Sequence, residues 1–359
     1  MIKYIGSKRV LVPAIRDVIG SLEGVGTVVD FFSGTSRVGH AMKSAGYRVL
    51  SNDLLTYAHT LATCYVQADR DGVLDDAATL LEEFSRLKGS PGYFTETFCE
   101  KSRFFQPHNG ERIDAIREAI AQKGLEPELE AVCLVSLMEA ADRVDSTTGV
   151  QMAYLKKWAA RSYNTLELRM PDVRPASPLG ECRAHQLEAR EAAKVLRGDV
   201  AYIDPPYNQH TYIGNYHIWE SLVRWDKPEV YGIACKRIDC KDRKSDFNSK
   251  RRAALALRDF LARVECRYLV VSFNNEGYIT REDMEAMLKQ HGDVYIVEKD
   301  YKRYVGARIG IYNPSGELVG KVGHLTNKEY IYVVVPAGQP WSLAESPDGL
   351  GATQATLFT

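Results

Sequence analysis

The sequence lacks several features that would place it in a specialised class of protein. Its seven cysteines include no C-x-x-C pair, which argues against a zinc site or a disulfide framework and is typical of a reducing cytoplasm. The amino terminus, MIKYIGSKRV, is unlike a signal peptide or a membrane span, and no long apolar run follows it. We therefore expect a cytoplasmic protein that requires no metal.

An excess of charge of either sign is also absent. Lys and Arg number 46 against 47 Asp and Glu, which leaves a net charge of -1. This balance neither supports nor excludes a polyanionic partner, because a local basic patch can supply phosphate contacts. The 359 residues, 45% of them hydrophobic, suffice for one large domain or for a core domain with an insertion.

What the sequence does have is an alternation of strand and helix patterns. Short runs rich in β-branched and aromatic residues predict strands at 27–32, 47–51, 200–203, 268–273, 294–297 and 330–335. Helical patterns cover 37–45, 251–264 and 281–290. Such alternation predicts an α/β fold, with a doubly wound, mostly parallel sheet and helices on both faces.

The alternation breaks between about residues 56 and 183, where the pattern is mainly helical. Helices are predicted at 73–87, 112–121 and 128–141, the last preceded by Pro127, which suits a helix start. We expect residues 61–179 to form an inserted helical lobe on a core domain made of 1–60 and 180–335. Residues 336–359, rich in Gly, Pro and Ser, are expected to form a loose tail.

A glycine-containing turn, DFFSGTSRVG at 30–39, follows the first predicted strand. The second glycine of a dinucleotide loop is replaced by Ser36, and no Walker lysine follows, which argues against a phosphate-cradling loop. Asp53 ends the next strand, where doubly wound folds place a ribose-binding carboxylate. Adenosine without phosphates is therefore the better ligand; a purely structural strand-turn-helix is the alternative.

The tetrad Asp204-Pro205-Pro206-Tyr207 follows the strand predicted at 200–203. Two consecutive prolines stop the strand and stiffen the turn, which suits a site that must orient an exocyclic amine. Adenine N6 is a poor nucleophile because its lone pair is delocalised into the ring. Hydrogen bonds from N6 to Asp204 and to the Pro205 carbonyl would favour a tetrahedral nitrogen that attacks a methyl group, while Tyr207 stacks on the flipped base. The alternative is a proline-rich turn with a solvated acid.

Together these motifs resemble the Dam-like (D12, alpha-group) class of adenine-N6 DNA methyltransferases, and within it the methylases of FokI-type restriction-modification systems. The resemblance covers nearly the whole chain except the tail. Besides the loop and the tetrad, the stretches that carry it are KYIGSK at 3–8, DRV at 142–144, GV at 149–150, YLK at 154–156, NQHTY at 208–212, NYH at 215–217, SDFN at 245–248 and SFNNEG at 272–277.

The resemblance implies a seven-stranded AdoMet-dependent methyltransferase sheet, S-adenosylmethionine (AdoMet) as cofactor and a flipped adenine in double-stranded DNA as substrate. It also implies a nucleoid-associated enzyme of bacteria or archaea, and leaves a companion restriction endonuclease open. The cofactor residues that it implies are Tyr4, Gly6, Ser7, Lys8, Asp30, Phe31, Phe32, Ser33, Gly34, Asp53, Leu54 and Asp204. Where the family usually has an acid shortly before the tetrad, this chain has His185 and Gln186, which we expect at the adenine edge of the cofactor.

DNA contacts are expected from the densest basic run, at 236–244 and 250–252, because it follows the catalytic loop. A solvated charged face is the alternative for the run, and core packing for the aromatic residues near the tetrad. Base reading is assigned to the helical lobe. The candidates are Asn208, Tyr212, Tyr216, His217, Lys236, Arg237, Lys241, Arg243, Lys244, Arg143 and Lys156.

Other activities are weighed against the same residues. Cytosine-C5 methylation is excluded because that reaction uses a Pro-Cys nucleophile, and no Pro-Cys dipeptide occurs. Cytosine-N4 methylation uses the same amine chemistry and stays open, as does a non-catalytic DNA-binding subunit that responds to AdoMet. RNA or protein-glutamine methylation more often uses Asn at the first tetrad position. The DNA sequence that is recognised cannot be deduced from the chain.

Overall fold

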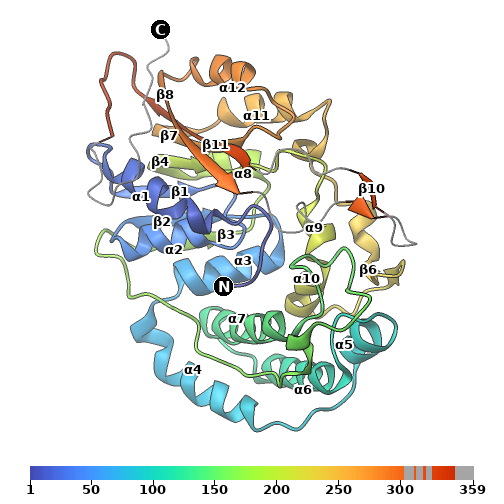
Figure 1. Cartoon of the computed structure of the whole chain (residues 1–359). Coiled ribbons are helices and arrows are strands. Elements are labelled where there is room, and N and C mark those ends of the chain that lie inside the picture. The colour runs from blue at the N-terminus through green and yellow to red at the C-terminus, as the bar shows by residue number, and fades with distance from the viewer. Residues whose placement is uncertain (303–310, 313–317, 321–325, 344–359) are drawn as a thin grey trace.

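The computed structural model describes residues 1–302, 311–312, 318–320 and 326–343 (Figure 1). Its centre is a seven-stranded sheet with the order β3-β2-β1-β4-β7-β11-β8. The strands are β1 (Thr27–Asp30), β2 (Arg48–Asn52), β3 (Arg183–His185), β4 (Arg197–Ile203), β7 (Glu265–Asn274), β8 (Asp293–Lys302) and β11 (Thr326–Val335). Strands β3, β2, β1, β4 and β7 pair in parallel, whereas β11 is antiparallel to both of its neighbours. The predicted α/β class with a mostly parallel sheet is confirmed.

Helices cover both faces of the sheet because its strands bury side chains on both sides. Val28 and Val29 of β1 enter different hydrophobic cores, as do Val200 and Ala201 of β4. One face carries α8 (Ala189–Val195), α11 (Ala253–Leu261) and α12 (Arg281–Leu288), and the other carries α1 (Val12–Gly20) and α2 (Arg37–Ser44). The result is a three-layer α/β/α arrangement.

A helical lobe lies below the sheet in Figure 1. It contains α4 (Arg70–Ser85), α5 (Tyr93–Thr95), α6 (Pro107–Lys123) and α7 (Pro127–Val144). Its core also takes Tyr57 from α3 (Thr56–Ala62) and Trp219 from α10 (His217–Arg224). The lobe core therefore combines residues 61–179 with segments on either side of that range. Pro127 begins α7 as predicted.

The remaining elements of the described residues are short. They are the turns η1 (Lys8–Val10), η2 (Thr63–Gln67), η3 (Glu96–Glu100), η4 (Ala160–Tyr163), η5 (Ile238–Lys241) and η6 (Asp246–Asn248), helix α9 (Tyr212–Asn215), and strands β5 (Val230–Tyr231), β6 (Lys236–Arg237), β9 (Ile311–Tyr312) and β10 (Leu318–Gly320). Among the helices of the described residues, none has the length and apolarity that a membrane span requires.

The start of the predicted tail packs onto the body of the protein. The Trp341 indole N–H donates to Ser21 Oγ at 2.9 Å, and its ring meets Tyr295 edge to face with centroids 5.3 Å apart. The rest of the tail, residues 344–359, lies outside the described residues.

The parallel strands end at one edge of the sheet, and this edge gathers the predicted site residues. Asp30 closes β1, His185 closes β3, and Asp53 and Asp204 directly follow β2 and β4. Open α/β sheets bind ligands at this carboxyl edge.

Candidate active site

A cavity of about 290 Å³ lies at the carboxyl ends of β1, β2 and β4. Its wall is formed by residues near the amino terminus, the loops after these strands, residues 187–189 and the segment 243–248. The predicted site residues that line it are Tyr4, Gly6, Ser7, Lys8, Asp30, Phe31, Phe32, Ser33, Gly34, Asp53, Leu54, Asp204, Pro206, Tyr212, Arg243 and Lys244. Sequence stretches far apart in the chain thus meet at one site.

The loop after β1 is tied to the acid that follows β2. Gly34 adopts a left-handed φ of 51°, and a Cβ at that position would lie 3.4 Å from the Tyr4 ring, so glycine fits here with least strain. The Gly34 N–H donates to Asp53 Oδ2 at 3.0 Å, and the Leu55 N–H donates to Asp53 Oδ1 at 3.0 Å. The Asp53 carboxylate is therefore held by backbone donors at the cavity wall.

Buried acids give the cavity an electrostatic preference for a cation. Burial, together with the nearby charges of Asp204 and Asp53, raises the pKa of Asp30 to about 8. Burial also raises the pKa of Asp53 to about 6, against the lowering effect of its backbone donors. Both oxygens of Asp30 are buried and lack a well-formed hydrogen bond within the described residues. A cation placed among these acids would favour their ionised forms.

Lys8 supplies a fixed positive charge beside the tetrad. Its Nζ lies 2.9 Å from Asp204 Oδ1, and the Lys8 side chain is only 6% exposed. Burial raises the pKa of Asp204 to about 6, while the Lys8 charge and hydrogen bond act in the opposite direction. Burial lowers the pKa of Lys8, but its carboxylate neighbours outweigh this effect and hold that pKa well above the ordinary value. Lys8 thus stays protonated and supports an ionised Asp204.

Stacked tyrosines hold the amino-terminal segment over the cavity. The Tyr4 ring stacks on Tyr212 and Tyr216, with centroids 5.1 and 4.5 Å away, and its hydroxyl lies 3.1 Å from that of Tyr57. The Ile5 N–H donates to the Tyr216 hydroxyl at 2.6 Å. The KYIGSK stretch is thereby fixed against the helix that follows the tetrad.

Two other stretches that carry the sequence resemblance also hold this site together. Asp142 Oδ2 accepts the Lys3 N–H at 3.0 Å, and Asp145 Oδ1 accepts Lys3 Nζ at 2.8 Å. Asn248 of the SDFN stretch donates to the Asn208 carbonyl at 2.8 Å. These residues anchor the segments that form the wall.

Tyr207 lies next to the cavity rather than on its described wall. Its ring meets Phe273 edge to face at 5.7 Å, and the Asn274 side chain hydrogen bonds its hydroxyl. The Tyr278 N–H donates to the Tyr207 carbonyl at 2.9 Å. The ring is therefore held from the β7 side, with its orientation set by these contacts.

The predicted DNA contacts of Tyr216, His217 and Arg237 need correction, because all three are buried. Their exposed fractions are 1%, 0% and 1%. His217 Nε2 pairs with the Gln151 carbonyl at 2.9 Å, and burial lowers the pKa of His217 to about 3, so the ring is neutral. These side chains build the interior, where phosphates have no access.

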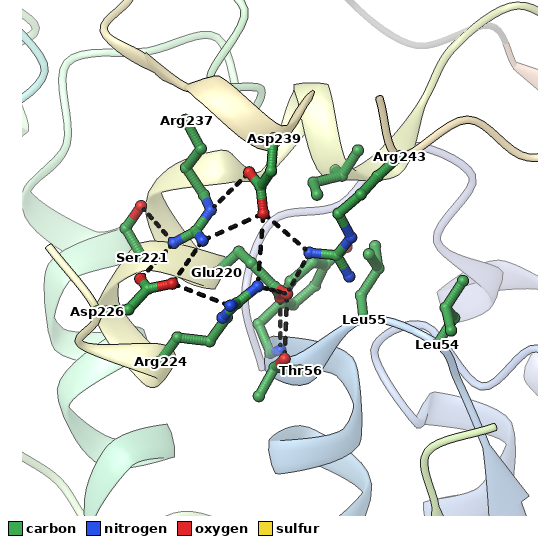
Figure 2. A network of polar contacts seen from close by, with 12 residues as sticks. Leu54, Leu55, Thr56, Glu220, Ser221, Arg224, Asp226, Arg237, Asp239 and Arg243 are labelled. Atoms are coloured by element: carbon green, nitrogen blue, oxygen red, sulfur yellow. Dashed lines mark hydrogen bonds and ion pairs between the residues drawn. The ribbon is translucent and has the colours of Figure 1, made fainter. Parts of the chain in front are cut away.

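Arginines of the basic run form ion pairs with acidic side chains of the same protein (Figure 2). Arg237 forms two hydrogen bonds of 2.7 Å with Asp226 and two, of 3.1 and 3.2 Å, with Asp239. Arg243 lies 2.9 Å from Glu220, although it still reaches the cavity wall. One of these acids, Asp239, belongs to the run itself, whereas Asp226 and Glu220 lie on the segment that precedes it.

The other DNA candidates lie apart from the cavity or at its rim. Lys241 is exposed and lies over the Tyr231 ring at 4.6 Å, and Lys236 Nζ lies 3.1 Å from Met152 Sδ. Lys156 is exposed on the segment after α7. Arg143 lines a second cavity of about 600 Å³, whose lining includes Arg37, which also lines the first.

His185 and Gln186, predicted at the adenine edge of the cofactor, lie beside the described cavity wall rather than on it. The His185 carbonyl accepts the Asp53 N–H at 3.2 Å, and Gln186 Nε2 donates to Thr56 Oγ1 at 3.1 Å. The next two residues, Leu187 and Glu188, do line the wall. An acid, Glu188, is therefore present at the wall two residues after Gln186.

Several wall residues were not singled out as site residues. Phe247 and Asn248 belong to the SDFN stretch, whose resemblance to the FokI-type methylases was the available signal. The other wall residues absent from the predicted site are Thr35, Arg37, Val38, Asn52, Leu55, Leu187, Glu188, Ala189, Tyr202, Thr211, Ile213 and Ser245. Most of them directly flank predicted residues in the chain.

The chain is similar in sequence to several methylases. Modification methylase StsI of Streptococcus sanguinis is 31% identical over 84% of this chain and 48% of its own length. Type II methyltransferase M.FokI of Planomicrobium okeanokoites is 30% identical over 84% of this chain and 49% of its own length. The chain thus spans about half the length of these two relatives, whereas M.NlaIII of Neisseria lactamica is 25% identical over 91% of this chain and 99% of its own length.

The model of one family matches residues 4–287, a range that includes the loop after β1, the tetrad and the basic run. On this match the chain belongs to the D12 class of N6 adenine-specific DNA methyltransferases.

Proposed function

We propose that this chain transfers a methyl group from AdoMet to N6 of a flipped adenine in double-stranded DNA. The observation that carries the proposal is one cavity that holds Asp204 beside Lys8 and also holds Asp30, Gly34 and Asp53. Asp30, Gly34 and Asp53 suit a cationic nucleoside, whereas Asp204 with Lys8 suits an exocyclic amine.

The wall fits AdoMet as a ligand. AdoMet carries sulfonium and ammonium charges, and the buried carboxylates with raised pKa, Asp30 above all, would stabilise a cation. Asp53 would accept the ribose hydroxyls, and Glu188 stands at the wall where an adenine edge could be bound. Gly34 would keep the loop close to the ligand. When bound, AdoMet supplies an electrophilic methyl group.

The amine would be oriented by the tetrad. The ionised Asp204 carboxylate accepts one N6–H, the Pro205 carbonyl accepts the other, and Lys8 holds Asp204 in place. The pKa of Asp204 is raised to about 6, so a reaction that needs the carboxylate should lose rate as the pH falls through that value. Tyr207 would give the flipped base an aromatic face.

DNA binding is assigned to the face around the cavity. Lys244 lies on the wall and Arg243 reaches it, so both could contact phosphates that flank the flipped base. We place catalysis in residues 1–60 and 180–335 and base reading in the lobe at 61–179. The relatives include proteins named modification methylases and type II methyltransferases. On that basis we propose a modification enzyme of a restriction-modification system, acting on nucleoid DNA in the cytoplasm beside a companion endonuclease.

The test is incubation with methyl-labelled AdoMet and mixed-sequence duplex DNA, followed by nucleoside analysis. Label in N6-methyladenine is the expected result. Label in N4-methylcytosine would replace adenine with cytosine as the substrate base. Cofactor and DNA binding without transfer would instead support a non-catalytic, AdoMet-responsive subunit.

A further inference from the structure

We propose that Glu329 on the antiparallel strand β11 is a positioning residue for this reaction. It shares the Lys8 ammonium with Asp204 and thereby keeps the Asp204 carboxylate a strong hydrogen-bond acceptor for the target amine. The inference rests on the proposed function for its meaning, but its central measurement needs neither cofactor nor DNA.

The three groups form a buried row. Lys8 Nζ lies 2.9 Å from Asp204 Oδ1 and 3.7 Å from Glu329 Oε2. The exposed fractions of the side chains are 6% for Lys8, 18% for Asp204 and 7% for Glu329. One ammonium therefore stands between two carboxylates, one from the catalytic loop and one from the sheet.

The sheet register explains how β11 reaches the site. Glu329 is paired directly with Asn274 of β7, and residues opposite each other in an antiparallel pair point to the same face. The Asn274 side chain hydrogen bonds the Tyr207 hydroxyl. Neighbouring residues of two strands thus support the two ends of the tetrad, Tyr207 through Asn274 and Asp204 through Lys8.

Burial of the Glu329 carboxylate at this position costs solvation free energy, which a positioning role would explain. Residues 330–335 of the same strand are apolar or aromatic and buried. Glu329 Oε2 is buried without a hydrogen bond, and Lys8 is the one cation within 4 Å of Glu329 in the described part of the chain. A buried carboxylate with one distant ion pair loses more solvation than the pair returns. Stability of the fold does not explain it.

The titratable groups around Asp204 determine whether its pKa rises or falls when Glu329 or Lys8 is removed. The titratable side chains that face it are Lys8 from η1, Glu329 from β11, Asp30 from β1, Tyr202 from β4, Tyr207 from the tetrad and Tyr212 from α9. Lys8 lowers the pKa of Asp204 and Glu329 raises it. Removing Glu329 therefore makes Asp204 a weaker acceptor, and removing Lys8 makes it harder to ionise.

The experiment titrates Asp204 by carbon-13 NMR of carboxyl-labelled aspartate in the whole chain, with Asp204→Asn to assign the signal. Glu329→Gln should shift the pKa of Asp204 down by about one unit, and Lys8→Met should shift it up. The matched control is Glu298→Gln on β8, whose carboxylate pairs with Arg281 and Lys328 and which should leave the titration in place.

Activity gives a second readout. Glu329→Gln should reduce kcat about tenfold at neutral pH and move its acid limb to lower pH, with the KM for the cofactor unchanged. An Asp204 titration that Glu329→Gln leaves unmoved, or that both variants move in the same direction, would overturn the proposal. If the wild type transfers no methyl group, the proposed function fails, while the NMR titration still decides whether Glu329 acts on Asp204.

Discussion

The loop that carries Asp204 and the basic segment at 236–252 both attract attention in the sequence, yet they use their polar groups in opposite ways. Asp204 faces the cavity and has Lys8 as its ion-pair partner. Arg237 is turned inward and forms ion pairs with Asp226 and Asp239 (Figure 2). The two prolines of the tetrad fix the direction in which Asp204 points. A run of charged residues shows that charges are present but not where each side chain points.

The inward pairs make the basic segment part of the site's support. Glu220 is fully buried and accepts Arg243 Nη1 at 2.9 Å, the Tyr57 N–H at 3.0 Å and Thr56 Oγ1 at 3.1 Å. It therefore links the segment to the start of α3, directly after the Asp53 loop (Figure 2). Two walls of one cavity are held together by a single carboxylate.

The largest effect is expected at Asp204. Asp204→Ala should reduce methyl transfer about 10³-fold because the amine loses its acceptor, while the AdoMet affinity changes little. Asp242→Ala, an exposed acid within the basic segment, serves as the matched control and should keep the rate within about twofold. Transfer assays paired with calorimetric titration of AdoMet measure both quantities. Turnover retained in Asp204→Ala would show that the acceptor is misassigned.

Arg237 tests the basic segment, because its ion pairs should contribute to the stability of the fold. Arg237→Ala leaves two aspartates without their partner and should lower the free energy of unfolding by roughly 3–5 kcal/mol. Lys241→Ala removes an exposed cation beside Tyr231 and should cost less than about 1 kcal/mol. Urea denaturation of both variants makes the measurement; equal losses would place Arg237 among ordinary surface cations.

The ion pairs of Arg237 with Asp226 and Asp239 also predict that the stability of the protein depends on pH. Burial raises the pKa of Asp226, but the hydrogen bonds and charge of Arg237 outweigh that effect and hold it below its ordinary value. The pairs should therefore contribute fully above the usual aspartate pKa of about 3.9 and lose their contribution as the pH falls below it. The stability gap between wild type and Arg237→Ala should shrink at pH 3, and a gap of constant size would argue against ion pairing.

Substitutions of Tyr207 separate the role of its aromatic ring from that of its hydroxyl group. Tyr207→Ala should slow transfer about 10- to 100-fold because the flipped base loses a stacking face. Tyr207→Phe keeps the ring against Phe273 and loses the hydroxyl contact with Asn274, so its loss should be within about threefold. Single-turnover rates compare the variants. Equal losses for Ala and Phe would assign the function to the hydroxyl.

The smallest effect is expected at Lys244, which has no ion pair within the described residues and lies on the cavity wall. Lys244→Ala should weaken DNA binding severalfold and reduce the slope of log affinity against log salt by about 0.9. Lys227→Ala, whose ammonium pairs with Glu118 on the lobe, is the control and should leave the slope unchanged. An unchanged slope in Lys244→Ala would remove this lysine from the phosphate contacts.

Local sequence predicted those features that depend on local rules. Short runs rich in β-branched and aromatic residues located the central strands, and Asp30, Asp53 and Asp204 were placed at strand ends, which meet at one edge of a parallel sheet. The three-residue strand β3 was missed, since so short a stretch shows no period. The position of His185 at the end of β3 was therefore not predicted either.

The partners of charged side chains could not be predicted, whether near or far in sequence. Asp226 and Asp239 neutralise Arg237, and Glu220 holds Arg243, but a single sequence does not show which acids meet which bases. Glu329 approaches Lys8 only because β11 inserts between β7 and β8. Local ion pairs explain the error at Arg237, whereas long-range strand pairing explains the position of Glu329.

The central claim is that Asp204 serves the methylation of adenine N6 in DNA. Mapping modified bases across the genome of a host that expresses the chain tests it most directly, with an Asp204→Asn variant in a parallel culture. The account predicts N6-methyladenine in one defined sequence context, present with the wild type and absent with the variant. Unmodified adenines with the wild type, or the modified base on cytosine, would contradict it.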